Sequence, residues 1–484
     1  MPGFIAFQTD KTNWGFETVP QTGLNGRRGY QPRGRGLGGS SAINAMLYLR
    51  GNKWDYDNWA ANGCPGWSHD EVLPWFRRAE NNARGADAWH GGDGPLHVSD
   101  QCDPHPGSIE FVEAARQLQY PVNEDFNGAR QDGVGIYQVT QKGGERWSSS
   151  RAYVEPGARR EALTVLTDVI AERVLFDEGR AWGVAYLQDG QEKIIRARRA
   201  VVLAGGVFGT PQLLMLSGIG PGGHLREHGV AVRIDRPAVG ANLQDHVDYV
   251  AGFETKGGYF LGSTLAGTLK MAGAMVQWMR HRRGTMTTPF AEAGGFITVD
   301  PASPAPDIQL HFVPLVLEDH GRTKVKSHGF SCHACVLRPE SHGTVRLQSI
   351  DARAAPLIDP AFLTDPRDMA LLKKGVRAMY RILDTPPLAN HKGRDRNPID
   401  LDNDDALERL IRARADTIYH PVGTARMGSD EMAVCDPKLR VRGVEGLYVA
   451  DASIMPKLIS GNTNAPSIMI GERCADFVKA DLTG

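Results

Sequence analysis

The amino-acid sequence predicts a mixed α/β and α+β fold, with one domain on a doubly wound parallel sheet and a second region rich in strands and helices. One observation is a continuously apolar run over residues 200–204, which leads into two glycines and an apolar helix, the order typical of parallel sheets. A second apolar run, over residues 446–450, ends at Asp451. The composition also changes near residue 246, where we place a domain boundary.

Length and composition limit the classes of protein to consider. A chain of 484 residues exceeds one ordinary domain, so two or three domains are expected, and 41% hydrophobic residues can form a large core. The formal net charge of −1 argues against a nucleic-acid partner, because phosphate binding requires a surplus of basic residues. No apolar run reaches the roughly 18 residues of a membrane span, so no transmembrane segment is predicted.

A glycine-rich stretch, RGRGLGGSSAINAMLYLRG, follows the turn-rich N-terminal residues. Gly34, Gly36 and Gly39 match G-x-G-x-x-G formally, but residues 30–32 precede them where a dinucleotide-binding motif requires a buried strand. We therefore predict a glycine–serine loop leading into a helix whose free N–H groups face an anion. A plain glycine-rich surface loop is the alternative.

The next segments are a helix and a loop-rich excursion. Ser68 and Glu71 have the spacing of a capping box and predict a helix over EVLPWFRRAEN. Residues 84–145 are rich in Gly, Asp and His, which indicates a lid over a site. This stretch contains the candidate metal ligands His90, His97, Asp103 and His105. Their spacing fits no helix or strand face, so we interpret them as solvated loop residues and predict no metal.

Strands joined by tight turns are predicted from residue 163 in LTVLTDVIAERVLFD, AWGVAYLQDG and EKIIRARRAVVLAGG. We expect the last of them to be buried on both faces and to end at Ala204 and Gly205, where the backbone can approach a ligand closely. Thr210 and Pro211 are predicted to open the following helix, because proline is favoured in a first helical turn.

The region from 247 to 415 contains a Met-rich helix, several strands such as DIQLHFVPLVL and GFSCHACVL, and two further helices. Three methionines recur at helical spacing, which predicts core packing: Met271, Met275 and Met279. Cys332 and Cys335 lie in a predicted strand, whose period of two sends their thiols to opposite faces. This argues for a structural strand over a metal or redox site, and the six cysteines do not form a disulfide framework.

The C-terminal stretch brings together residue types suited to catalysis. His420 lies in a Tyr-His-Pro-Val-Gly turn, and Asn462 and Asn464 precede an apolar helix that begins near Pro466. The apolar run that ends at Asp451 and the start of this helix predict a cofactor cradle, with the histidine and an asparagine at its mouth.

These motifs together resemble the glucose–methanol–choline (GMC) flavin oxidoreductases. The stretches concerned are RGRGLGGSSAINAMLYLRG, GGVFGTPQLLMLSGIGP, VGANLQDH, YHPVGTARMG and GLYVADASIMP…GNTNAPSIMIGER. They occur in the family's order over essentially the whole chain, and the likeness is greatest to bacterial choline-dehydrogenase-like alcohol dehydrogenases. The resemblance implies an FAD-binding doubly wound domain of the glutathione-reductase type and a substrate domain built on an antiparallel sheet.

The resemblance also implies a division of the chain. We expect FAD-domain parts at 1–83, 146–246 and 416–484, a lid or substrate-domain excursion at 84–145, and a substrate domain at 247–415. The family's first strand, G-x-G-x-x-G turn and helix do not appear, so the FAD domain is expected to be N-terminally incomplete. We expect Met1 to be an internal methionine of a longer gene product; a natural or degraded truncation is the alternative.

Roles for individual residues follow from the resemblance. His420 matches the active-site histidine, expected to act as the base that removes the hydroxyl proton of an alcohol. Asn462 matches the second active-site position and would donate a hydrogen bond to the substrate oxygen, while FAD N5 would accept the hydride. The expected FAD-binding residues are Gly38, Gly39, Ser40, Asn44, Ala45, Met46, Leu47, Ala171, Ala204, Gly205, Asp451, Ala452 and Asn464. Ile43 occupies the position through which some relatives attach FAD covalently, so we expect non-covalent FAD.

The expected activity is therefore FAD-dependent oxidation of an alcohol CH–OH group to an aldehyde or ketone. The electrons would pass to a non-nicotinamide acceptor, which could be a quinone, a cytochrome or oxygen. A flavin-less inactive truncated homologue and a GMC-type lyase are the alternatives. We expect the protein to be cytoplasmic or peripheral to the inner membrane.

Overall fold

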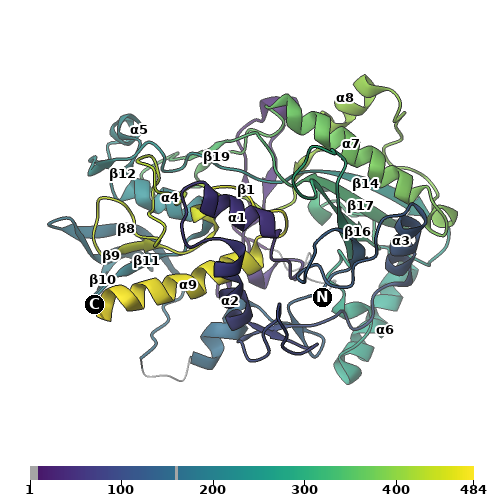
Figure 1. Cartoon of the computed structure of the whole chain (residues 1–484), viewed down its shortest axis with the longest axis horizontal. Coiled ribbons are helices and arrows are strands. Elements are labelled where there is room, and N and C mark those ends of the chain that lie inside the picture. Colours follow the sequence, from purple (N-terminus) through teal and green to yellow (C-terminus); the bar gives the residue numbers. More distant parts are fainter. Residues whose placement is uncertain (1–8, 158–161, 484) are drawn as a thin grey trace.

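The computed structural model describes residues 9–157 and 162–483, which gather into two lobes that lie side by side (Figure 1). The α-helices are α1 (Lys53–Ala61), α2 (His69–Ala79), α3 (Pro106–Gln117), α4 (Gly206–Leu216), α5 (Gly222–Glu227), α6 (Leu265–His281), α7 (Pro366–Leu383), α8 (Asp404–Arg414) and α9 (Asn464–Thr483). The short helical turns used below are η3 (Gly39–Ala42), η6 (Thr285–Thr287) and η9 (Ala452–Ile454). None of the helices in the described part of the chain has the length and apolarity needed to span a bilayer.

One lobe is built on a six-stranded sheet whose neighbouring strands all run antiparallel. Its strands, in spatial order, are β20 (Asp416–Thr417), β14 (Val247–Thr255), β17 (His328–Val336), β16 (Ile308–Val313), β15 (Ala293–Ile297) and β5 (Gly133–Ile136). Helix α7 packs against β17, and α3 packs against β5 and β15. The expected antiparallel sheet is thus confirmed, and its edge strands come from sequence outside 247–415.

The other lobe contains a parallel pair, β11 (Val201–Leu203) and β21 (Leu447–Val449), in which Val201 lies opposite Leu447. Beside it lies the predicted meander of β8 (Val169–Asp177), β9 (Arg180–Gln188) and β10 (Gln191–Arg196). The remaining strands form two-stranded pairs: β1 (Phe16–Glu17) with β2 (Tyr30–Gln31), β3 (Glu80–Asn82) with β4 (Leu96–Val98), β6 (Gln141–Lys142) with β7 (Glu145–Arg146), β12 (Ile219–Gly220) with β13 (Ile234–Asp235), and β18 (Thr344–Arg346) with β19 (Leu357–Asp359).

Strand β11 differs from the expectation of burial on both faces. Val201 and Leu203 are buried in a core that they share with α4 side chains, whereas Val202 is 45% exposed. Ala204 and Gly205 are exposed as well. The continuous apolar run predicts a strand that is covered on both faces. In the structure the described residues cover only one face of this parallel pair.

Helix α4 starts earlier than predicted, at Gly206, so that Pro211 lies inside it instead of in its first turn. Proline has no N–H to donate to the carbonyl four residues earlier, which is that of Val207. The hydroxyl of Thr424 donates to this carbonyl oxygen at 2.6 Å. A side chain from the C-terminal part of the chain therefore satisfies the acceptor that the proline leaves open.

The glycine–serine loop does not lead into an α-helix, which corrects the prediction for residues 44–50. Gly38 has a φ of 86° and precedes the short turn η3, after which the chain continues without helical structure. Met46 adopts a left-handed φ of 63°, and the Asn44 side chain accepts from the Met46 backbone N–H at 3.0 Å. Leu47 then forms a bridge with Val139. The run of apolar side chains fills a small core against the 84–145 segment instead of one helix face.

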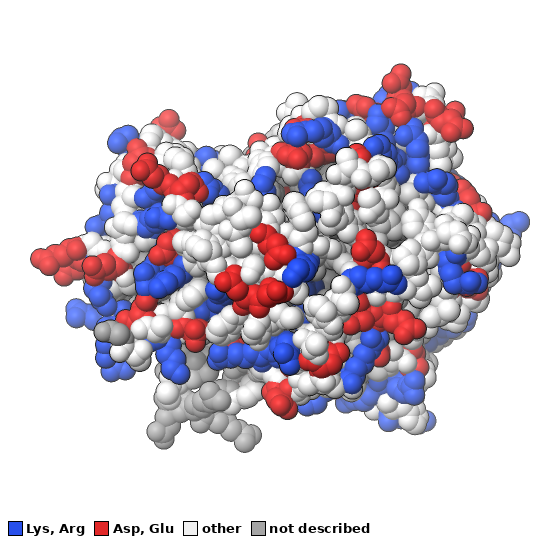
Figure 2. Space-filling view, in the orientation of Figure 1, with Lys and Arg blue, Asp and Glu red and all other residues white. Residues whose placement is uncertain are grey.

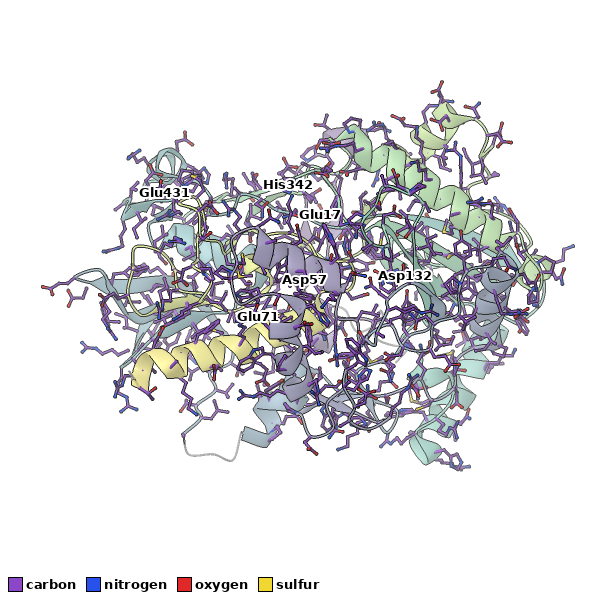
Figure 3. All side chains as sticks on the ribbon, viewed as in Figure 1. Glu17, Asp57, Glu71, Asp132, His342 and Glu431 are labelled. Carbon is purple, nitrogen blue, oxygen red and sulfur yellow. The ribbon has the colours of Figure 1, made fainter. Side chains whose placement is uncertain are left out.

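Capping chemistry at α2 agrees with the prediction. Ser68 and Glu71 form a capping box, and the backbone N–H of His69 donates to Asp57 of α1 at 3.0 Å. Figure 3 labels Asp57 on α1 and Glu71 in the first turn of α2. This hydrogen bond ties the start of α2 to α1.

Two further sequence interpretations are corrected by burial. His90 is only 3% exposed and lies between Glu80 and Asp125, at 3.1 Å and 3.0 Å, so it belongs to a buried ionic network instead of a solvated loop. Met275 and Met279 of α6 are 37% and 58% exposed instead of packed in a core. Among the described residues no cluster of three or more His, Cys, Asp and Glu side chains could hold a metal ion.

Candidate active site

His420 lies at the end of β20, where a tight turn directs it inward. Tyr419 has a left-handed φ of 77°, and the backbone N–H of His420 donates to Asp245 Oδ1 at 3.0 Å. The other oxygen of Asp245 accepts from the Thr417 hydroxyl at 2.6 Å. Asp245 is 2% exposed and burial, partly offset by these hydrogen bonds, raises its pKa to about 6. This carboxyl group therefore shapes the turn that carries the histidine.

Hydrogen-bond partners fix the tautomers of His246 and His420. His246 Nε2 lies 3.1 Å from the carbonyl oxygens of Leu337 and Ile459, which only accept, so this nitrogen carries the proton. His246 Nδ1 is then an acceptor and receives a hydrogen bond from His420 Nδ1 at 3.0 Å. This leaves His420 Nε2 unprotonated, and its lone pair accepts a hydrogen bond from the amide nitrogen of Asn462 at 3.0 Å.

Asn462 is oriented by a partner on the antiparallel sheet. Gln309 of β16 donates through Nε2 to Asn462 Oδ1 at 3.0 Å, which leaves the Asn462 Nδ2 group to donate toward His420. Asn462 is followed within two residues by α9, whose first N–H groups have no acceptor inside the helix. The amide, the imidazole and the positive end of the helix thus meet at one point.

Burial keeps the imidazoles around His420 uncharged. It lowers the pKa of His420 well below the usual 6.5, with smaller contributions from His246, His311 and Arg33. Burial is also the main reason why the pKa values of His246 and His311 fall to about 3. His420 is therefore a neutral imidazole at neutral pH, in the protonation state that can accept a proton.

These groups border a cavity of about 730 Å³ between the two lobes. Eleven of the residues predicted from the sequence line it: His420, Asn462, Gly38, Ser40, Asn44, Ala45, Met46, Leu47, Asp451, Ala452 and Asn464. The first glycine-rich loop, the end of β21 and the start of α9 are therefore brought together around the reaction site, although they are far apart in the sequence.

Four predicted residues lie elsewhere. Gly39 is in η3 beside the cavity but not among its lining residues. Ala171 is exposed on β8, opposite Tyr186, and Ala204 and Gly205 are exposed after β11. The structure does not bring these four to the wall of the same cavity.

The cavity residues fit FAD in shape and in chemistry. One face of α9 lines the cavity with Asn464, Ser467, Ile468, Gly471, Glu472 and Ala475. Gly471 and Ala475 also border a second hollow of about 470 Å³, together with Val202 and Ala450 of the parallel pair. Both hollows therefore border α9. In the cavity wall, Nε and Nη2 of Arg33 are buried without a partner in the described chain, and would suit an oxygen-rich ligand group.

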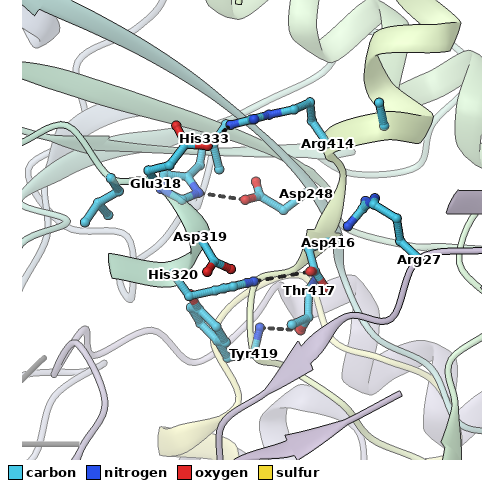
Figure 4. A pocket seen from close by; sticks show the side chains of 13 residues that line it. Arg27, Asp248, Glu318, Asp319, His320, His333, Arg414, Asp416, Thr417 and Tyr419 are labelled. Carbon is cyan, nitrogen blue, oxygen red and sulfur yellow. Dashed lines mark hydrogen bonds and ion pairs between the residues drawn. The ribbon is translucent and has the colours of Figure 1, made fainter. Parts of the chain in front are cut away.

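Another wall of the cavity is formed by two imidazole–carboxylate pairs (Figure 4). His333 Nδ1 lies 2.6 Å from Asp248, and His320 Nε2 lies 3.2 Å from Asp416. His320 Nδ1 also lies 2.7 Å from the Tyr419 hydroxyl. Both histidines border a small charged pocket of about 180 Å³ on their other side. The two pairs therefore separate the large cavity from this charged pocket.

Sequence reasoning missed several residues of the site. Gln309 and His311 share one face of β16, and His311 lies opposite His333 of β17. Their period-two spacing in DIQLHFVPLVL could have placed both on one face of the strand. His246 was part of a recognised motif, VGANLQDH, but its partner in the fold is almost two hundred residues away. No pattern in the sequence alone would have paired it with His420.

Comparisons with known proteins show which family this chain is similar to. Sequence profiles of the GMC oxidoreductase family match residues 13–248 and 339–471. An alcohol dehydrogenase [acceptor] of Pseudomonas putida is 43% identical over 490 aligned positions, covering 100% of this chain and 89% of that protein. An oxygen-dependent choline dehydrogenase of Rhizobium rhizogenes is 40% identical, covering 99% of this chain and 88% of that protein.

Solved structures show the same fold. A pyridoxine 4-oxidase from Mesorbium loti superposes with a TM-score of 0.88 at 27% identity, covering 100% of this chain and 91% of the other. A formate oxidase superposes with a TM-score of 0.92 at 26% identity, covering 100% and 92%. The chain belongs to the GMC oxidoreductase family, whose members are FAD-dependent enzymes with this FAD-binding fold.

Proposed function

We propose that this protein oxidises the CH–OH group of an alcohol to an aldehyde or ketone, with His420 as the base and Asn462 as the hydrogen-bond donor to the substrate oxygen. The observation that carries the proposal is the unprotonated His420 Nε2 beside the Asn462 amide, which donates to it at 3.0 Å in the wall of the cavity until a substrate oxygen takes its place. An alcohol oxygen that approaches both groups would give its proton to Nε2 and accept a hydrogen bond from Nδ2.

The surrounding residues support these roles. His246 fixes the tautomer of His420, and Gln309 fixes the orientation of the Asn462 amide, so neither group has to reorganise when substrate binds. FAD, when bound, supplies the two-electron acceptor that takes the hydride from the substrate carbon. We further propose that nine of the lining residues named above, all but His420 and Asn462, hold FAD without a covalent bond, and that 247–415 forms most of the substrate domain.

The substrate that fits best is an uncharged alcohol. Two carboxylates line the cavity, and both have other partners: Asp451 accepts from Gly206 and Thr210, and Glu472 lies 3.2 Å from Arg78. The wall of the cavity also contains imidazoles and apolar side chains, such as His311, Val313 and Ile418. A quaternary ammonium such as choline would find no free carboxylate among the described residues of this wall.

Choline remains the second candidate, because relatives at about 40% identity carry the name choline dehydrogenase. The name of the Pseudomonas putida relative, alcohol dehydrogenase [acceptor], supports an acceptor other than a nicotinamide. We propose a quinone, a cytochrome or oxygen as the electron acceptor.

Steady-state reduction of an artificial dye with added FAD tests the proposal directly. We expect turnover with a series of primary alcohols, a higher kcat/KM for uncharged alcohols than for choline, and loss of turnover in His420→Gln. Alcohol-dependent dye reduction would exclude both the inactive homologue and the lyase. A protein that binds FAD but reduces no dye with any alcohol would contradict the proposal, and a reversed preference would favour choline.

A further inference from the structure

Helix α6 carries an apolar stripe that faces away from the protein. Leu265, Leu269, Val276 and Met279 are 81%, 68%, 43% and 58% exposed. Their spacing of four, seven and three residues places them within one narrow sector of the helix, since each residue turns the helix by about 100°. Large side chains exposed singly are ordinary, but an aligned row of this kind indicates a surface that binds something apolar.

The opposite side of α6 holds the helix on the protein. Trp278 donates through Nε1 to the carbonyl oxygen of Gly144 at 2.9 Å, and α6 also contacts η6. Gly267, in the first turn, is buried. Helix α6 is therefore attached to the protein through the side that carries Gly267 and Trp278. The exposed stripe lies on the other side, so it is not the surface by which the helix packs on the protein. At the lower right of Figure 1 the helix extends beyond the neighbouring elements.

The sequence of α6 and its flanks contains basic residues and no acidic ones. From Lys256 to Ala291 the chain contains no Asp or Glu, but it contains Lys256, Lys270, Arg280, Arg282 and Arg283. Arg282 and Arg283 pair with Glu145 and Asp103, at 3.4 Å and 2.8 Å. The other three form no ion pair with a carboxylate of the described chain. Figure 2 shows lysine and arginine side chains at the lower right edge, where α6 lies.

We propose that α6 is an interfacial helix that docks this enzyme on an anionic lipid surface, with the apolar stripe inserted among the acyl chains and the basic side chains against the headgroups. The combination of a narrow apolar face, Lys and Arg beside it and a length too short and polar to span is typical of helices that lie in the membrane plane. Anionic headgroups attract such basic segments, and salt weakens the attraction.

A lipid surface suits the charges better than a second copy of the chain does. A two-fold symmetric dimer through α6 would place the same basic residues of both copies against each other, which is unfavourable unless anions intervene. Anionic lipids supply negative charge at that place. The stripe also leads toward the site, because Pro289, Phe290 and Ala291 follow shortly after α6 and line the large cavity. Membrane docking would thus place one wall of the cavity close to apolar molecules dissolved in the bilayer.

Vesicle sedimentation of the full chain tests this proposal. We expect binding to phosphatidylcholine vesicles that contain phosphatidylglycerol, weaker binding at high salt and little binding to pure phosphatidylcholine. The variant Leu265→Gln/Leu269→Gln/Val276→Gln should lower the ratio of bound to free protein by at least about tenfold, because three apolar side chains no longer insert. Glutamine has a helix propensity close to that of leucine, so the helix should persist.

A matched control uses exposed apolar residues away from α6. Ile194, Ile195 and Ile350 are 52%, 47% and 64% exposed, and their triple glutamine variant should bind vesicles as the wild type does. Thermal melting of both variants checks that the fold is intact. Wild type that does not bind the anionic vesicles, or a stripe variant that binds them equally well, would overturn the proposal. So would a concentration-dependent dimer in light scattering that the stripe variant abolishes while vesicle binding is absent.

Discussion

Two groups of histidines border the same cavity, and they differ in what their nitrogens face. The ring nitrogens of His246 and His420 meet carbonyls, an amide and each other, and those of His311 are buried without a hydrogen-bond partner in the described chain. None of these three histidines has a carboxylate on a ring nitrogen in the described chain. His320 and His333 each bond a buried or half-buried carboxylate, Asp416 and Asp248. All five side chains come from the six-stranded sheet or the turns around it, so the difference lies in partners and not in the fold.

The comparison shows how one sheet can carry imidazoles for opposite purposes. Burial without a counter-charge makes the charged form of an imidazole unfavourable, which keeps His420 ready to accept a proton. A carboxylate next to His333 instead favours a fixed, hydrogen-bonded geometry in the wall between the cavity and the charged pocket. We therefore expect the first group to carry the chemistry and the second to shape the cavity.

The largest expected difference between the two groups is in turnover. His420→Gln should lower kcat by about 10²–10⁴-fold, because the hydroxyl proton then has no positioned acceptor. His333→Gln, the matched change in the second group, should lower kcat by less than about tenfold. Flavin reduction by an alcohol, followed in a stopped-flow instrument with FAD-loaded protein, measures both. Equal losses in the two variants would contradict the division of roles.

Asn462→Asp should give His420 a carboxylate partner, such as His320 and His333 already have. A carboxylate in place of the amide would stabilise the protonated imidazole and raise the pKa of His420, which burial holds well below 6.5 in the wild type. The base form would then be lost as the pH falls through the raised pKa. We expect kcat to fall by about 10²-fold at neutral pH, with partial recovery at alkaline pH, whereas wild-type kcat should depend little on pH below neutrality. A pH profile of flavin reduction gives the answer, and parallel profiles would contradict the assignment.

The pH dependence of stability should also reflect the histidines that burial keeps neutral. His311 is 3% exposed, neither ring nitrogen has a hydrogen bond of ordinary geometry, and its pKa is about 3 against 6.5 for a free imidazole. The unfolded chain therefore binds a proton below about pH 6.5 that the folded chain does not, so stability falls with decreasing pH by about 1.4 kcal/mol per unit for each such histidine.

His311→Phe should remove one of these contributions. Between about pH 6.5 and pH 5 the variant should gain about 2 kcal/mol relative to the wild type, and it should not be less stable at neutral pH, because an unpaired polar ring is replaced by an apolar one. Denaturant unfolding at fixed FAD concentration measures the difference. An unchanged acid slope would show that His311 is charged or hydrated in the folded protein.

Local sequence patterns were sufficient for much of the fold. The capping box of α2, the meander of β8 to β10 and the apolar strand β21 were predicted because each depends on neighbouring residues. Patterns that are compatible with two environments failed. The apolar run of β11 looks the same whether one or both faces are covered, and the methionine spacing of α6 looks the same whether it faces a core or another apolar phase.

The site was predicted in part, for a related reason. His420 and Asn462 stand in motifs specific enough to be recognised by resemblance, and the structure places them 3.0 Å apart. The groups that orient them are His246, which directly precedes β14, and Gln309, which lies on β16. Which residues of different strands become neighbours depends on sheet order, and the sequence does not state that order.

The smallest expected effect concerns Asp248, and it has the opposite sign to that of the histidines. Burial raises the pKa of this carboxyl above its usual 3.8, with His333 acting in the other direction. The folded chain then holds a proton that the unfolded chain releases, so this group's contribution to stability is present below pH 3.8 and is lost as the pH rises through the raised pKa. Asp248→Asn keeps an acceptor for His333 but cannot ionise, so that loss should disappear. We expect the variant to gain about 1 kcal/mol of stability relative to the wild type at neutral pH, because it no longer carries a carboxyl group that ionises less readily in the folded chain than in the unfolded chain. Thermal melts across this pH range would show a flatter profile for the variant, and a profile that steepens instead would mean that the charged pair with His333 stabilises the wall of the cavity.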